Sequence, residues 1–175
     1  MISPFPMPAP KTSLSRLFEA EEAPLLHFAL GLVGRKSVAE ELVQEAFLRL
    51  HQVWADVENP RAWLYRSLRN LALNHLRDHR RETALEGAPE PTHEGDMPPD
   101  AMGRSEAVGL VRMLLAELPE EDRQLIRLKY HENLKYQEIG QRTGLNAGNV
   151  GYRLHHLLKG LADSLRHAGI ESSHG

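Results

Sequence analysis

Apolar residues recur at intervals of three and four through most of this chain, and strict alternation of polar and apolar residues is nearly absent. The first spacing is typical of amphipathic α-helices and the second of half-buried strands, so the pattern predicts an all-α protein. We expect six or seven helices and no sheet. Helices are expected over residues 14–32, 37–55, 60–81, 106–118 and 119–131, with two more between 133 and 169. Pro24 is expected to interrupt the first of them, because proline lacks the backbone donor that a helix interior needs.

Two of these helices begin with recognisable caps. Ser37 and Glu40 have the spacing of a capping box, in which each side chain accepts a hydrogen bond from a backbone N–H at the start of the helix. Asn59 followed by Pro60 is a typical N-cap with proline at the first helical position. The residues therefore predict helix starts near 37 and 60.

The segment 133–161 has the spacing of a helix-turn-helix, counted from Tyr136 as its first position. The five diagnostic positions hold Ile139, Gly140, Gly144, Leu145 and Val150. Gly144 falls at the turn, where the backbone needs a positive φ that glycine adopts without strain. Such a unit presents its second helix to the major groove of DNA, and the alternative is an ordinary helical hairpin with a glycine turn.

The formal net charge of −3 is unusual for a DNA-binding protein, but the acidic surplus is confined to the middle of the chain. Residues 81–108 hold two basic and seven acidic side chains, together with four prolines and three glycines. This composition predicts a flexible linker. The expected organisation is a tail (1–11, with prolines at 4, 6, 8 and 10), a helical module (12–81), an acidic linker (82–105), a second helical module (106–168) and a short tail (169–175).

Composition excludes several other classes of function. The chain has no cysteine, which favours the reducing cytoplasm and excludes disulfides and thiolate sites. No apolar run is long enough to span a membrane, so no membrane insertion is expected. His75 and His79 stand four residues apart, but no further residue completes a metal site. We therefore expect no metal, no cofactor, no small-molecule substrate and no catalytic site.

The helix expected from Pro60 carries a second candidate nucleic-acid surface. Its polar side chains recur every three or four residues and so share one face: Arg66, Asn70, Asn74, Arg77 and Arg81. Trp63 lies in the first turn, so arginines stand beside an aromatic ring, as unstacked nucleic acid requires. The alternative is that Trp63 belongs to the core and the arginines form a solvated face.

Three stretches, 39–50, 59–81 and 115–154, resemble extracytoplasmic-function (ECF) sigma factors of bacterial RNA polymerase in order and spacing. They are similar to sigma regions 2 and 4. The resemblance implies a subunit that binds core RNA polymerase, reads the −35 element of promoter DNA with region 4, and reads and opens the −10 element with region 2. It also implies an anti-sigma factor as a partner.

The family motifs assign residues to three surfaces. The resemblance implies core polymerase contacts at Glu41, Leu42, Gln44 and Phe47. It implies −10 contacts at Val57, Glu58, Asn59, Trp63, Arg66, Asn70, Asn74, Arg77 and Arg81. It implies −35 contacts at Asn146, Asn149, Tyr152, Arg153, His156 and Lys159. The linker of relatives threads the polymerase cleft, so an acidic linker is expected to imitate the charge of RNA, with a passive tether as the alternative.

The chain departs from the family pattern at a few positions. Gly151 and His156 stand where many relatives have basic residues, which is expected to weaken phosphate contacts at the −35 element. Asn74 stands where many have Asp. Two other interpretations remain open: a helix-turn-helix transcriptional regulator that does not join polymerase, and a catalytic helical bundle, which lacks a converging set of acid, base and ligand groups.

Overall fold

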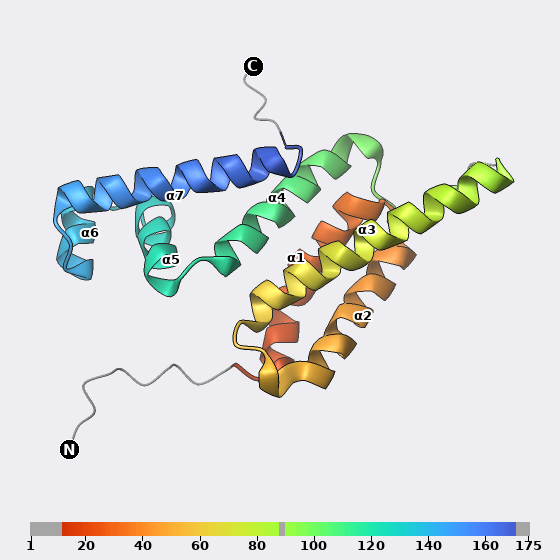
Figure 1. The fold of residues 1–175 in the computed structure, drawn as a ribbon, viewed down its shortest axis with the longest axis horizontal. Coiled ribbons are helices and arrows are strands. Elements are labelled where there is room, and N and C mark those ends of the chain that lie inside the picture. Colours follow the sequence, from red (N-terminus) through yellow and green to blue (C-terminus); the bar gives the residue numbers. More distant parts are fainter. Residues whose placement is uncertain (1–11, 88–89, 171–175) are drawn as a thin grey trace.

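The computed structural model describes residues 12–87 and 90–170, and over these ranges the chain forms helices and no strand (Figure 1). This confirms the predicted all-α fold. The predicted tail at 1–11 and residues 171–175 of the predicted tail at 169–175 lie outside the described residues. The helices are α1 (Leu14–Val33), α2 (Lys36–Val53), α3 (Pro60–Glu86), α4 (Pro99–Glu117), α5 (Glu120–Ile126), α6 (Tyr136–Thr143) and α7 (Ala147–His167). A 3-10 turn, η1 (Trp54–Asp56), follows α2, and a π-helical turn, η2 (Arg127–His131), extends α5.

The predicted interruption at Pro24 is wrong, because α1 continues through this residue to Val33. Proline removes one backbone hydrogen bond from a helix interior. On the C-terminal side of Pro24, α1 buries an apolar stripe that includes Leu25 and Phe28, each fully inaccessible to solvent. Burial of such side chains contributes about 1.5–3 kcal/mol each, so packing outweighs the lost hydrogen bond.

The predicted capping box at Ser37 is also wrong. Helix α2 begins at Lys36 with Arg35 as its N-cap, and Ser37 lies inside the first turn. The backbone N–H of Lys36 donates instead to Oδ1 of Asp96, at 2.9 Å. A residue sixty positions away therefore caps the helix, which no local sequence pattern indicates.

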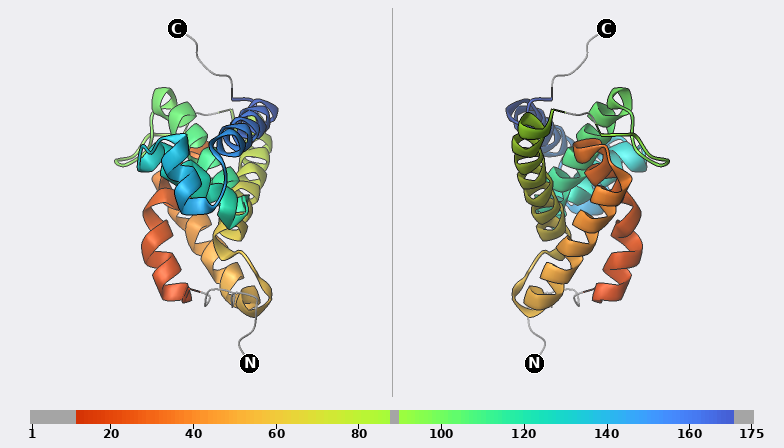
Figure 2. Two further views of the ribbon diagram at one scale, coloured as in Figure 1. Left: turned by 90° about the vertical axis from the view of Figure 1, so that its left-hand side faces the viewer. Right: turned by 90° about the vertical axis from the view of Figure 1, so that its right-hand side faces the viewer.

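Helices α1 to α4 share one hydrophobic core, with α4 lying between the α1–α3 bundle and α7 (Figures 1 and 2). Leu110 and Met113 of α4 are buried in it beside α1 and α3. Two glycines permit the close crossing of α1 and α4. A Cβ on Gly31 would lie 2.5 Å from the backbone nitrogen of Glu106, and one on Gly109 would overlap the ring of Phe28.

Helix α3 is longer than predicted and runs to Glu86, and α4 begins at Pro99 rather than near residue 106. The C-terminal half of α3 projects beyond the bundle (Figure 1). The segment that precedes α4 contacts the turn between α1 and α2, where the N–H of Met97 donates to the carbonyl of Gly34 at 2.7 Å.

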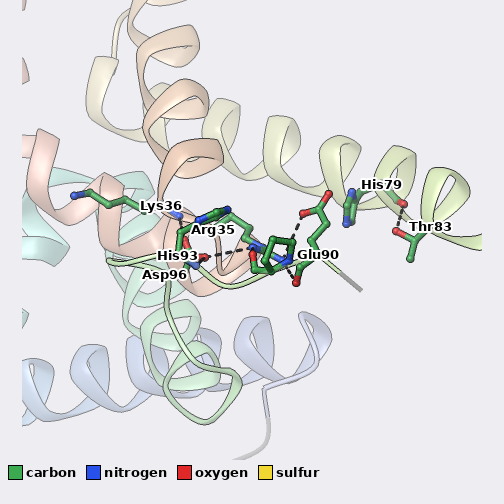
Figure 3. Close-up of polar contacts among 8 residues, drawn as sticks. Arg35, Lys36, His79, Thr83, Glu90, His93 and Asp96 are labelled. Carbon is green, nitrogen blue, oxygen red and sulfur yellow. Dashed lines mark hydrogen bonds and ion pairs between the residues drawn. The ribbon is translucent and has the colours of Figure 1, made fainter. Parts of the chain in front are cut away.

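Arg35 anchors this part of the acidic linker (Figure 3). Its guanidinium donates to the carbonyl of Glu90 at 3.0 Å and to that of Pro91, and it pairs with the carboxylates of Glu90 and Asp96. The Asp96 carboxylate also accepts from the N–H of His93 at 2.8 Å. These backbone hydrogen bonds, then the charge of Arg35, hold the pKa of Asp96 below its ordinary value.

A second, smaller core joins α5, η2, α6 and α7, and it contains the helix-turn-helix. Its buried residues are Leu125, Leu128, Ile139, Val150 and Leu154. Gly144 ends α6 with φ +79°, as the turn requires. A Cβ on Gly140 would overlap the carbonyl oxygen of Leu145, so this position needs glycine because the turn folds back over it.

Replacing Asp96 by Ala is expected to lower the midpoint of thermal unfolding, because the N-terminus of α2 loses its cap. A carboxyl group with a depressed pKa stabilises the fold above its unfolded pKa, and this contribution is lost as the pH falls through the folded value. The difference between wild type and variant should therefore be largest near pH 7 and vanish in acid. Glu94→Ala removes a neighbouring linker charge as the control, and equal midpoints for the two variants would contradict the capping role.

Gly140→Ala is expected to destabilise the second core, because the added methyl group meets the Leu145 carbonyl. Gly160→Ala is the matched control, since its Cβ faces open space in the same module. The control should gain stability by about 1 kcal/mol, the difference in helix propensity between alanine and glycine. Urea titration monitored by circular dichroism measures both changes, and a stabilised Gly140→Ala variant would show that the turn relaxes.

Candidate polymerase and nucleic-acid surfaces

The candidate polymerase surface lies on α2 and extends onto α1. Glu41 and Gln44 are exposed, whereas Leu42 is half-buried. Phe47 is only 8% exposed, and its ring packs edge-on against that of Phe18, with centroids 4.9 Å apart. Phe47 is therefore part of the core as well as of the groove wall.

A groove of about 670 Å³ runs between these two helices and has a largely apolar lining. Leu48 forms part of it and is 61% exposed, and Phe18 is 40% exposed. The family motif does not include Phe18, whose place in the groove depends on how α1 packs against α2. Phe18 lies on the exposed side of α1, and a large apolar residue at such a position could have identified it as a candidate contact residue.

The candidate −10 residues separate into two groups along α3. Six of them line one cavity of about 730 Å³ at the start of the helix: Val57, Glu58, Asn59, Trp63, Arg66 and Asn70. Trp63 is half-buried and packs against the first core, so one part of the ring is structural and another part belongs to the cavity wall. Asn74, Arg77 and Arg81 lie farther along α3 and are exposed.

Two of the cavity residues contact the C-terminal end of α4. Asn59 caps α3, since its Oδ1 accepts from the N–H of Ala62 at 3.2 Å, and its Nδ2 donates to the carbonyl of Ala116 at 2.8 Å. The guanidinium of Arg66 makes a two-pronged ion pair with the carboxylate of Glu117, with 2.9 Å between Nη2 and Oε2. This hydrogen bonding raises the pKa of Arg66.

Glu117 also lines the cavity, although no sequence motif predicts it there. It stands 51 residues after Arg66, in a segment assigned to the other module. Only the packing of α4 on α1 and α3 brings the two side chains together.

A polar network centred on the buried Glu21 holds the first two turns of α3 against α1. Glu21 of α1 is 6% exposed, accepts from the hydroxyl of Tyr65 at 3.0 Å, and pairs with Arg61 at 2.6 Å. Burial, and then the carboxylate of Glu21, raise the pKa of the Tyr65 hydroxyl, which stays protonated and keeps donating. The carboxylate is thus satisfied from two sides, as a buried charge requires.

The candidate −35 side chains on α7 form one exposed stripe. Asn149, Tyr152, His156 and Lys159 recur at three- and four-residue intervals and are exposed. The ring of Tyr152, 66% exposed, packs edge-on against that of His156 with centroids 4.4 Å apart. The stripe lies opposite Val150 and Leu154, which seat α7 on the second core.

Two other candidate −35 residues have structural contacts. Arg153 pairs with Asp122 of α5 at 2.7 Å and is 36% exposed, so it holds the recognition helix against α5. Asn146 caps α7, because its Oδ1 accepts from the N–H of Asn149 at 2.8 Å.

The family pattern treats Gly151 as the loss of a basic DNA contact, whereas the structure shows that glycine is needed there for packing. A Cβ there would lie 3.1 Å from the ring of Tyr136, so Gly151 marks the close contact between α6 and α7. It faces its own domain, where a lysine would have to bend around the ring.

Within the described ranges, no group of three or more His, Cys, Asp or Glu side chains is arranged to hold a metal ion. None of the helices described there is long and apolar enough to cross a membrane.

Comparison with known proteins gives two family matches in the order expected from the motifs. Residues 17–82 match sigma-70 region 2, and residues 109–161 match sigma-70 region 4. The two matched segments contain the α2 surface and the α7 stripe, respectively.

Individual relatives align along most of the chain. The ECF RNA polymerase sigma factor SigF of Caulobacter vibrioides is 30% identical over 145 residues, which cover 81% of this chain and 79% of SigF. The ECF sigma factor SigL of Mycobacterium tuberculosis is 29% identical over 158 residues, covering 88% and 89%. The sigma factor RpoE of Bartonella quintana, solved with the anti-sigma factor NepR, has 22% identity over 87% of this chain and 96% of its own, with a TM-score of 0.38.

A regulator with a helix-turn-helix alone has no counterpart of region 2, and this chain matches both regions in a single polypeptide. The chain belongs to the extracytoplasmic-function family of RNA polymerase sigma factors.

Proposed function

We propose that this sigma factor binds core RNA polymerase in the cytoplasm and directs it to promoters through three separate surfaces, without catalysing a reaction itself. The observation that carries the proposal is the cavity at the start of α3. It combines a half-buried tryptophan with an arginine and two amide side chains: Trp63, Arg66, Asn59 and Asn70. Aromatic, cationic and amide groups in one hollow are what an unstacked base and its phosphate require.

The polymerase-binding surface in this proposal is the groove between α1 and α2. Leu48, Phe18 and Phe47 supply apolar side chains to its lining, and Gln44 supplies a polar one. Glu41 is exposed on α2, three residues before Gln44. An exposed apolar strip of this kind on a small protein typically marks a protein interface. An anti-sigma factor that covers the same strip in the absence of polymerase is the second partner we propose.

Opening of the −10 element falls to the α3 surface. Val57, Glu58 and Asn59 line the cavity together with Trp63, and a flipped base would enter it beside the tryptophan ring. Asn74, Arg77 and Arg81 extend the polar face along the helix, where positive charge holds the backbone of the separated strand. An asparagine at position 74 both donates and accepts, so it can contact a base edge directly.

Recognition of the −35 element falls to the α7 stripe. Asn149 and Tyr152 lie nearest the N-terminus of the recognition helix, which is the end that reaches base edges. Lys159 and His156 lie where phosphate contacts would form. Asn146 and Arg153 support this surface from behind through the α7 cap and the contact with α5.

Leu48→Asp is expected to weaken binding to core polymerase by about tenfold or more, because burial of a leucine side chain contributes about 1.5–3 kcal/mol. Leu85→Asp is the matched control, since Leu85 is 88% exposed and lies at the far end of α3. Fluorescence anisotropy of labelled protein titrated with core enzyme measures both affinities. Equal affinities of the two folded variants would place the polymerase contact elsewhere.

Trp63→Ala is expected to leave the closed promoter complex intact and to impair opening, because stacking acts only on bases that have left the duplex. Stacking on an aromatic ring contributes about 1–3 kcal/mol per base. Permanganate footprinting reports unpaired thymines directly, and Trp63→Phe, which keeps an aromatic face, should retain most of the opening. Normal opening by a folded Trp63→Ala variant would show that the ring is purely structural.

A further inference from the structure

We propose that a second cavity, lined by residues of α3, α4, α5 and η2, binds a nucleoside polyphosphate. The cavity has a volume of about 880 Å³, a size typical of small-molecule sites. None of the residues assigned to the polymerase, −10 or −35 surfaces lines it. The proposal therefore goes beyond promoter binding and adds a small-molecule ligand to this sigma factor.

Four arginines converge on this cavity, which we call the arginine cavity: Arg61, Arg112, Arg123 and Arg127. They come from four different elements of the chain. Among the residues that line the cavity, Glu120 is the one acid. Guanidinium groups hold phosphate oxygens through paired, charge-assisted hydrogen bonds, so several of them around one hollow favour a phosphorylated ligand.

Two of these arginines are positioned by the buried polar network of Glu21. The Glu21 carboxylate pairs with Arg61 at 2.6 Å and accepts a hydrogen bond from the hydroxyl of Tyr65. The side chain of Arg112 interacts with the same hydroxyl. The network thus fixes both arginines, which remain exposed to solvent, so binding a ligand would cost them less conformational entropy than it costs a free surface arginine.

The other two arginines share a single carboxylate. Glu120 pairs with Arg123 at 2.8 Å and with Arg127 at 3.3 Å. Nε of Arg123 is buried and has no hydrogen-bond partner among the described residues, a state that is rare in folded proteins. Across the cavity, four arginines face two carboxylates, those of Glu21 and Glu120, and two positive charges are left for an anion.

The same cavity offers an apolar platform for a base. Tyr130 of η2 is 57% exposed and lines the cavity together with the half-buried side chains of Leu115 and Ile126. An exposed aromatic ring can stack on any nucleobase. Inorganic phosphate would use the arginines and leave this apolar part of the lining in water. The combination therefore indicates a nucleotide.

The convergence of the arginines favours a free nucleotide over a single strand of nucleic acid. A strand carries one charge on each phosphate and separates neighbouring phosphates by a sugar. A nucleoside triphosphate places all of its charge in one short chain of phosphates, which matches four guanidinium groups around one hollow. The positive cavity also stands apart from the formal net charge of the chain, which is −3.

The test measures binding of ATP to the full chain by isothermal titration calorimetry, at low salt and without divalent cations. We expect one saturable site. Arg127→Gln should weaken binding by about tenfold, the loss expected for one hydrogen bond to a charged group. Arg142→Gln is the matched control, since Arg142 has a similar exposure, 58% against 53%, pairs with Glu132 and lies outside the cavity. It should bind ATP like wild type.

Glu120→Gln should have the opposite effect and tighten ATP binding about two- to fivefold, the range expected for release of an exposed ion pair. Its control is Glu132→Gln, which releases Arg142 outside the cavity and should change nothing. Circular dichroism verifies that each variant is folded. Weaker binding by a folded Glu120→Gln variant, or equal losses in Arg127→Gln and Arg142→Gln, would overturn the site.

Tyr130→Leu tests whether the ligand is a nucleotide. It should weaken ATP binding by about fivefold or more, because a stacking ring is lost, and leave the affinity for inorganic tripolyphosphate unchanged. Equal affinities of the wild type for ATP and tripolyphosphate would overturn the nucleotide assignment. Displacement of ATP by citrate as readily as by tripolyphosphate would show a nonspecific anion surface, and tighter, Arg127-dependent binding of oligothymidylate would show a nucleic-acid surface. Either result, or no detectable binding of ATP, would overturn the proposal.

Discussion

The arrangement of the whole molecule depends on one close contact, the crossing of α1 and α4 at Gly31 and Gly109. Glycine at both points lets the backbone of α4 approach α1 and lets Phe28 lie flat against Gly109. Without it, Leu110 and Met113 could not enter the core that α1 to α3 build around Leu64 and Leu68. Helix α4, whose C-terminal part lies within the region 4 match, is thus part of the region 2 core, and this places Glu117 in the lining of the α3 cavity.

The linker takes part in the same assembly. Asp96 caps α2. Arg35, at the turn between α1 and α2, donates hydrogen bonds to two linker carbonyls and forms ion pairs with the carboxylates of Glu90 and Asp96. Glu90 and Asp96 are therefore engaged within the protein. Any imitation of RNA by the linker inside polymerase would first require these two acids to leave Arg35, so the linker's charge and the closed packing of α4 are coupled.

Sequence patterns correctly predicted the features of the fold that depend on interactions between neighbouring residues. Helical periodicity, the Asn59–Pro60 start and the turn at Gly144 all appear where the residues indicate, because each depends on neighbours within a few positions. The errors at Pro24 and Ser37 have a common cause: packing and a cap supplied from distant residues outweighed local preference. The candidate site shows the same division. The motifs led to six residues that share the α3 cavity, whereas Glu117 depends on tertiary packing that no spacing encodes.

Part of the acidic charge of this chain is used in ion pairs with its own arginines. Three arginines hold carboxylates of the same chain: Arg35 with Asp96, Arg66 with Glu117 and Arg153 with Asp122. Each pair lowers the local positive potential, which weakens nonspecific attraction to phosphates. Arg153 and Asp122 belong to one core and need not separate when DNA binds, but Arg66 and Glu117 lie on helices of different regions. The same kind of ion pair therefore joins two helices of one module in the case of Arg153, and joins α3 of region 2 to the end of α4 in the case of Arg66.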